Sequence, residues 1–127
     1  MKDCIILTHQ FIRENEQDKL DVTNFSLKHH RQNNPNAYII VVGHGIRPSE
    51  FYLNECDHVI WHDNIIESDI GVGHPMLCNK GFDCAMEKGF DFAMKARLDC
   101  INLTYDILKM CQTFIDDKKI LTTQETS

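Results

Sequence analysis

A guanidinium and a carboxylate stand two residues apart in Arg97-Leu98-Asp99. The preceding segment, Phe90–Leu98, is mostly apolar with Lys95 and Arg97 interleaved, which predicts a β-strand with one face near polar groups. Asp99 would then emerge at the carboxyl end of this strand, where ligands bind in open α/β sheets. The structural alternative is that Asp99 caps a helix or forms an ion pair with Arg97.

Histidines follow two other apolar runs that are typical of buried strands. His9 comes just after Cys4–Leu7, and His44 comes just after Tyr38–Val42. Binding groups concentrate on the loops that follow rigid strands, so both histidines are candidate ligand contacts. The alternative for each is a polar residue that only ends a strand.

Two further histidines, His58 and His62, are four residues apart in a third, shorter apolar run. In an extended strand they would share a face and offer two imidazoles to a metal ion. Zinc sites use three or four protein ligands, and the pattern contains no third one here. The His29-His30 pair is instead expected at the solvated end of a helix.

A helix is predicted between these strands and the Asp99 strand. Apolar residues recur at spacings of three and four from Leu77 to Ala85, with Pro75 suited to the first turn and Lys88-Gly89 to the end. Gly81 and Ala85 are small residues one turn apart, so this helix would approach a sheet closely. The neighbouring phenylalanines are expected to cluster in the core: Phe82, Phe90 and Phe92.

The remaining pattern predicts helices that alternate with the strands. One helix is expected between Arg13 and Arg31, a short helix or turn in Pro48–Cys56, and an amphipathic helix in Thr104–Asp116. Lys118–Thr122 reads as a last strand, through whose exposed edge two copies would pair as a homodimer. Alternating strands and helices predict a single α/β domain over 1–127, Rossmann-like, with three α/β/α layers and a mainly parallel sheet.

Composition excludes several classes of partner. The net charge is −6, with no basic cluster beyond Lys28–Arg31, which argues against nucleic acid. The sequence shows neither a signal peptide nor a run long enough to form a transmembrane segment. Six cysteines are present and no two form a C-x-x-C pair, which predicts reduced thiols and a cytoplasmic location.

The order of these elements resembles the donor-binding half of a GT-A type glycosyltransferase, a nucleotide-diphospho-sugar transferase. The initial CIILTHQ run leads through a helix to YIIVVGHG, as in that family. The helix with Cys78-Asn79-Lys80-Gly81 is similar to the family's asparagine-glycine helix. Phe92–Asp99 (FAMKARLD) stands where the family carries its Asp-x-Asp metal motif, with an arginine in place of the first acid.

The resemblance implies a UDP- or GDP-linked sugar as ligand, with Mn²⁺ or Mg²⁺ held by Asp99. A departing diphosphate needs positive charge, which this cation and Arg97 would supply. Asn79 and Lys80 have a solvated helix face as their alternative. The implied donor contacts are Thr8, His9, His44, Asn79, Lys80, Arg97 and Asp99.

The resemblance leaves the catalytic residues unassigned. Members of the family continue into an acceptor-binding half that supplies a carboxylate base, and the pattern after Leu121 contains no counterpart. The alternative function is therefore a non-catalytic nucleotide- or carbohydrate-binding module. An unrelated signalling receiver is disfavoured, because Thr8-His9-Gln10 lacks the acids that a Mg²⁺-dependent phosphoacceptor site needs.

Overall fold

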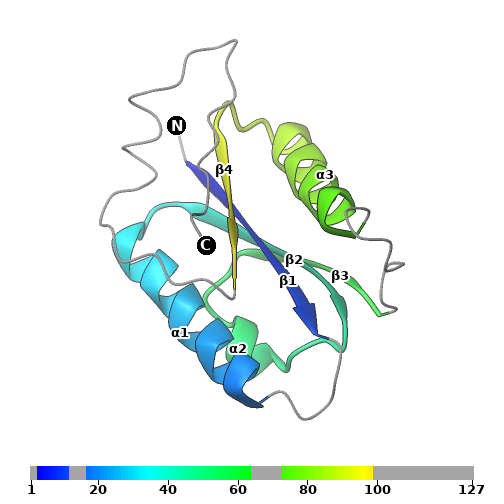
Figure 1. Ribbon diagram of the computed structural model, residues 1–127. Coiled ribbons are helices and arrows are strands. Elements are labelled where there is room, and N and C mark those ends of the chain that lie inside the picture. Colours follow the sequence, from blue (N-terminus) through cyan, green and yellow to red (C-terminus); the bar gives the residue numbers. More distant parts are fainter. Residues whose placement is uncertain (1–2, 12–16, 64–72, 99–127) are drawn as a thin grey trace, which may run out of the picture.

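The computed structural model describes residues 3–11, 17–63 and 73–98 as a four-stranded parallel sheet with helices on both faces (Figure 1). The strands are β1 (Cys4–Phe11), β2 (Tyr38–Gly45), β3 (His58–His62) and β4 (Ala93–Arg97). Their order is β3-β2-β1-β4, so the chain places β2 and β3 on one side of β1 and β4 on the other. This confirms a small α/β fold with a parallel sheet.

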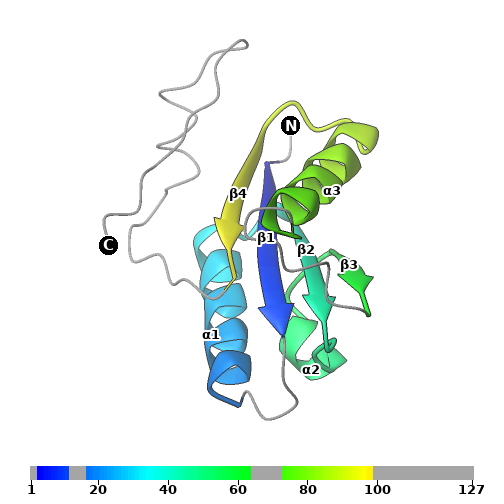
Figure 2. The same ribbon diagram turned by 45° about the vertical axis from the view of Figure 1, so that its right-hand side comes forward.

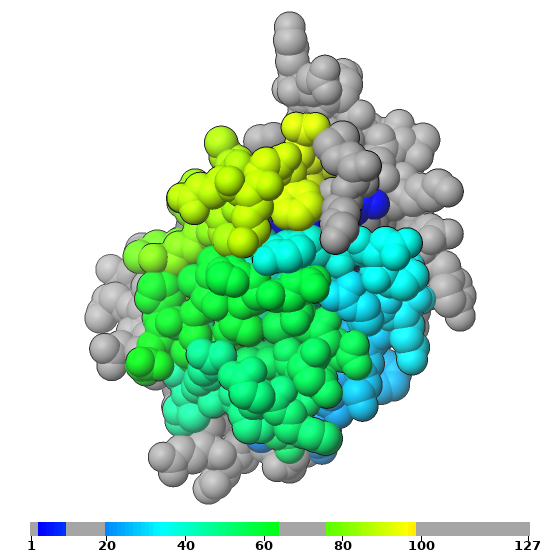
Figure 3. Space-filling view, turned by 180° about the vertical axis from the view of Figure 1, so that it is seen from behind, coloured from blue at the N-terminus to red at the C-terminus, as the bar shows by residue number. Residues whose placement is uncertain are grey.

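The helices form the outer layers. Helix α1 (Gln17–Asn33) and the single turn α2 (Glu50–Leu53) lie on one face of the sheet, and α3 (Gly73–Glu87) lies on the other (Figure 2). From behind, α1 and the α2 region lie side by side (Figure 3). The helix predicted for Thr104–Asp116 and the strand predicted for Lys118–Thr122 lie outside the described residues.

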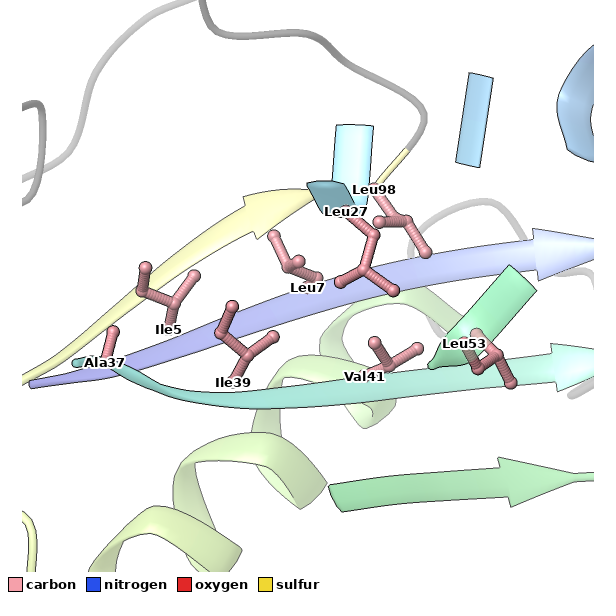
Figure 4. Close-up of a cluster of buried hydrophobic side chains, with 8 residues drawn as sticks. All are labelled: Ile5, Leu7, Leu27, Ala37, Ile39, Val41, Leu53 and Leu98. Carbon is pink, nitrogen blue, oxygen red and sulfur yellow. The ribbon is translucent and has the colours of Figure 1, made fainter. Parts of the chain in front are cut away.

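The face of the sheet toward α1 carries the larger apolar cluster (Figure 4). Alternate residues of β1 and β2 supply its centre, and Leu27 of α1 and Leu53 of α2 close it. Full burial of a Val, Leu or Ile side chain adds about 1.5–3 kcal/mol to the free energy of unfolding relative to leaving it exposed. The buried members are Ile5, Leu7, Leu27, Ala37, Ile39, Val41, Leu53 and Leu98.

The opposite face packs against α3 at very short range. Cys4, Ile6, Ile40 and Val42 of the strands meet Leu77 and Ala85 of the helix. A Cβ built on Gly81 would lie 2.4 Å from Ile6 Cγ2, so no larger residue fits without movement. The predicted close approach is confirmed, and Gly89, with φ 85°, ends the helix in the left-handed conformation expected of it.

The expected cluster of three phenylalanines does not form. Phe82 is 38% exposed on α3. Phe90 packs against the cluster under α3, whereas Phe92 packs against the cluster on the α1 face. Because β4 begins only at Ala93, the chain between the two phenylalanines is not an extended strand that would put them on one face.

The amino edge of the sheet is tied together by Arg31. Its Nε and Nη2 donate to Glu55 O at 3.1 and 3.0 Å, and its Nη1 donates to Ala37 O at 2.7 Å. Nη2 also lies 2.7 Å from Asp57 Oδ2, which accepts a hydrogen bond from Ile39 N at 2.8 Å. One guanidinium thereby joins the end of α1, the start of β2 and the loop before β3.

The expectation of a solvated His29-His30 pair is wrong for His30. This side chain is 3% exposed, because it follows Thr23 and Leu27 on the buried stripe of α1. Burial, with a smaller contribution from His29, lowers the pKa of His30 to about 4. Its Nε2 is buried without a hydrogen-bond partner among the described residues.

Candidate functional site

Four of the polar strand-end residues form two cross-strand pairs at the carboxyl edge of the sheet. All strands are parallel, so their carboxyl ends meet at this one edge. Thr8 of β1 is the register partner of Arg97 of β4, and His44 of β2 is the register partner of His62 of β3. Residues far apart in the sequence are thus neighbours across the sheet.

These two pairs share the face that α3 covers. Side chains alternate between the faces of a strand, so residues an even number apart point the same way. Each of the four lies two or four residues beyond a strand residue packed under α3. Thr8 and His44 are each 3% exposed, whereas Arg97 is exposed. The packed residues that define the face are Ile6, Val42, Ile60 and Ala93.

His9 lies on the other side of the sheet. It follows Ile5 and Leu7, which pack in the cluster on the α1 face, and it is 4% exposed. Its Nε2 is 3.5 Å from Thr23 Oγ1 of α1. The structure therefore does not bring His9 together with Thr8 and His44, although the three were expected to contact one ligand.

His62 acts electrostatically on its cross-strand neighbour His44. The pKa of His44 is lowered, mainly by burial and secondly by the neighbouring His62. His62 Nε2 is buried and has no hydrogen-bond partner among the described residues. His58 shares the face of His62 but lies four residues away, about 13 Å along a strand. The neighbour of His62 across the sheet is therefore His44, and the sequence pattern did not reveal this pair.

The two α3 candidates differ in position. Leu77 and Gly81 face the sheet, so Asn79 lies on the opposite side of the helix and is exposed. Lys80 lies at the flank and is half-buried. Asn79 therefore fits its solvated alternative better than a ligand contact, whereas Lys80 stays a prediction.

The pairing of β1 with β4 continues to the end of the described strand. Leu98 N donates to Thr8 O at 2.9 Å, one residue beyond the Thr8–Arg97 pair. Asp99 itself lies outside the described residues. Within the residues that the structure describes, no group of three or more His, Cys, Asp or Glu side chains is arranged to hold a metal ion.

The strand order marks one position on this edge as special. The connections from β1 lead to β2 and β3 on one side, and β4 lies on the other, so the order reverses between β1 and β4. Ligands of open α/β sheets bind in the crevice outside such a reversal, at the carboxyl ends of the strands. Here that position is occupied by Thr8 and Arg97.

Burial reduces the reactivity of two thiols in the described part of the chain. Cys4, Cys56, Cys78 and Cys84 are not joined in disulfide bonds, and burial raises the pKa of Cys4 to about 11, which keeps it protonated and unreactive at neutral pH. The pKa of Cys56 is also raised, mainly by burial.

No family model matches the chain, and no match was found among curated proteins or among solved structures. Among the described helices, none combines the length and apolar character that crossing a membrane requires. Function is therefore inferred from the chemistry of the carboxyl edge.

Proposed function

We propose that this domain binds a nucleoside diphosphate sugar in the crevice between the carboxyl ends of β1 and β4, as a glycosyltransferase-like domain. The observation that carries the proposal is the pairing of Thr8 with Arg97 at the reversal of strand order. It puts a hydroxyl and a guanidinium side by side where this class of sheet binds ligands.

The charges available there suit a diphosphate. The planar guanidinium of Arg97 matches phosphate oxygens bidentately, and its exposed position leaves it accessible to a ligand. Helix α3 follows β3, so its amino-terminal end lies toward the same edge, and its dipole favours an anion there. Asp99, two residues after Arg97, would hold Mn²⁺ or Mg²⁺ through its carboxylate oxygens.

Sugar transfer requires stabilisation of the negative charge that develops on the departing nucleoside diphosphate. Arg97 would interact with these phosphate oxygens, and a cation bound at Asp99 would supply further positive charge when present. Thr8, buried at the carboxyl end of β1, would orient the ligand through its hydroxyl group.

Binding without catalysis is the second candidate. Release of UDP or GDP from the corresponding sugar nucleotide, with or without added sugar acceptors, separates the two candidates. Turnover would exclude the non-catalytic module.

The binding proposal is tested by thermal shift and calorimetry with UDP, GDP and their sugar conjugates, each with and without Mn²⁺. We expect at least one of them to stabilise the wild-type chain at millimolar concentration, because a ligand that binds the folded state alone raises its stability. Arg97→Ala should lose most of this effect.

The matched control is Lys88→Ala, which removes one positive charge near the amino edge, where Lys88 Nζ lies 5.4 Å from the centre of the Tyr38 ring. This variant should bind as the wild type does. Absence of any shift with all four ligand classes, or equal losses in the two variants, would refute binding at Arg97.

A further inference from the structure

Among the described residues, α3 exposes apolar side chains on the flank that lies beside the edge strand β4 (Figure 2). We propose that this flank is a docking surface for a segment of the same chain, residues 104–116, which would lie as an amphipathic helix beside α3. Residues 118–122 would then pair with β4 as a fifth strand. The inference concerns how the domain is completed, and it does not depend on nucleotide binding.

The position of the flank follows from the contacts of α3. Gly81 faces the sheet, where a Cβ on it would meet Ile6 of β1 and Val42 of β2. Because α3 joins two parallel strands, it runs antiparallel to them, and each residue of a right-handed helix advances by about 100°. The step from Gly81 to Phe82 therefore leads from the sheet toward β4. Cys78 and Met86 lie one turn before and after Phe82, and the three form one stripe.

The two flanks of α3 differ in chemistry. On the β4 side, Phe82 is 38% exposed and Met86 is 74% exposed. The flank toward β3 is mainly charged, with Met76 as its one exposed large apolar residue among those described, and its charged residues are Lys80, Asp83 and Glu87. Contiguous exposed apolar side chains mark an interaction surface, whereas single ones are ordinary. The docking surface is therefore expected on the β4 side.

The path of the chain indicates which segment covers this surface. Helix α3 connects β3, at one edge of the described sheet, to β4 at the other. A further parallel strand beside β4 continues in the same direction across the sheet. Such connections are right-handed in about 98% of cases, which puts the next helix on the same face as α3. Residues 104–116 and 118–122 follow β4 in the order that this unit requires, a helical pattern and then a strand pattern.

The chemistry of the segment matches the surface that it would cover. Lys95 and Arg97 of β4 lie on the same face as Ala93, which packs under α3. Residues 104–117 contain three aspartates and one lysine, so the charges are complementary. The apolar stripe of the segment would pack on the flank of α3, and it consists of Ile107, Leu108, Cys111, Phe114 and Ile115.

The edge of β4 is the second part of the surface. In the described sheet this strand pairs with β1 on one side only, and all of its residues are half-buried or exposed. Open strand edges lead to pairing with other chains, and native proteins cover them. The Ile120-Leu121-Thr122 run has the β-branched and apolar character of a strand that would pair there.

Native cysteines of the full chain report the docking. Cys111 lies in the apolar stripe of the segment, so docking should protect it from N-ethylmaleimide, with labelling located by peptide mass spectrometry. Phe82→Asp puts a carboxylate into the contact, where burial without a partner is unfavourable, and should raise the labelling rate of Cys111 at least about tenfold. The matched control is Met76→Asp, at a side chain of similar exposure, 39%, on the other flank, and it should leave the rate unchanged.

Cys4 distinguishes local undocking from loss of the fold. It is fully buried in β1, so its labelling reports global unfolding and should stay slow in both variants. Hydrogen exchange of the wild-type chain gives a second measurement that needs no variant. Amides of residues 104–116 and 118–122 should exchange more slowly than those of an unstructured peptide of the same sequence, and equal rates would overturn the proposal.

The labelling experiment can also contradict the proposal. Rapid labelling of Cys111 in the wild type, or equal rates in the wild type and in a folded Phe82→Asp variant, would exclude docking on this flank. Protection that is lost on dilution would assign the flank to a second copy of the chain instead. Phe82 lies outside the residues assigned to the diphosphate site, so the thiol measurement is independent of whether nucleotide binds.

Discussion

The amino and carboxyl edges of the sheet differ in how their polar groups are hydrogen-bonded. At the amino edge, the Arg31 guanidinium is hydrogen-bonded to Glu55 O, Ala37 O and Asp57 Oδ2, at 2.7–3.1 Å, and every one of these acceptors belongs to the protein. At the carboxyl edge, polar residues stand beside one another across strands, and His62 keeps a buried nitrogen without a partner among the described residues.

This difference separates stability from function. Hydrogen-bonding groups directed at the protein's own backbone hold connections in place, and they have little capacity left for a ligand. A buried atom that lacks a hydrogen-bond partner, as His62 Nε2 does among the described residues, keeps that capacity, at a cost in stability. Substitutions at the amino edge should therefore change the free energy of unfolding, and those at the carboxyl edge should change binding.

Arg31→Ala should have the largest effect. It removes the donors of Glu55 O and Ala37 O and the partner of Asp57, so we expect the free energy of unfolding to fall by about 3 kcal/mol. Urea denaturation followed by Trp61 fluorescence measures this. The control is Arg47→Ala, which breaks an exposed pair with Glu50 and should cost at most about 1 kcal/mol. Equal costs would mean that the Arg31 network does not fix the amino edge.

Near the amino edge, His30 differs from Arg31 because its buried Nε2 has no hydrogen-bond partner among the described residues. This histidine should make the free energy of unfolding depend on pH. Its pKa is about 4 in the folded chain against 6.5 for the unperturbed group, so the unfolded state takes up a proton first as the pH falls. This proton leaves the free energy of unfolding unchanged above pH 6.5 and lowers it below that value, by roughly 2–3 kcal/mol at pH 4.5. Urea denaturation at pH 7 and 4.5 should show a smaller pH difference for His30→Leu, and an undiminished difference would contradict the burial of this ring.

Gly43→Ala tests whether the Trp61 ring packs directly on Gly43 at the carboxyl edge of the sheet. A Cβ at residue 43 would lie 2.1 Å from Trp61 Cζ3, and the indole would have to move away from Gly45 O, to which its Nε1 now donates at 3.0 Å. We expect a loss of about 2 kcal/mol, which is typical of overpacking. Trp61 is the only tryptophan, so its emission should shift to longer wavelength. Unchanged emission would show that the ring does not cover this glycine.

Arg97→Ala should have the smallest effect on folding, within about 0.5 kcal/mol, because its side chain is exposed. The same variant should lose most of the stabilisation by nucleotide described above. Urea denaturation without ligand gives the first quantity. A loss comparable to that of Arg31→Ala would show that Arg97 is a structural tie, and the functional distinction between the edges would fail.

Local pattern predicted the strands well and their extent poorly. The apolar runs placed the starts of β1 and β2 at Cys4 and Tyr38, as observed. Both strands continue further than predicted, through Thr8-His9-Gln10 and Gly43-His44-Gly45, because backbone pairing does not depend on the polarity of the side chains. Of these two glycines, only Gly45 has positive φ, and Gly43 is needed instead for the space that Trp61 fills.

The candidate site was predicted as separate residues. Thr8 and Arg97, and likewise His44 and His62, become pairs only through a strand order that depends on contacts between distant segments. The misplacement of His9 was avoidable, since consecutive residues of a strand lie on opposite faces. The burial of His30 could not be predicted from the sequence pattern, because α1 has a thin apolar stripe in which Thr23 and His30 take core positions.

The contact at Gly81 has a consequence for how this fold can change. Because residue 81 has no side chain, main-chain atoms of α3 pack directly against Ile6. No space remains between helix and sheet for a side chain at this position. Adding even one methyl group there would force α3 or the Ile6 side chain to move. A single inner position therefore sets how closely α3 packs on the sheet, without altering any residue at the carboxyl edge.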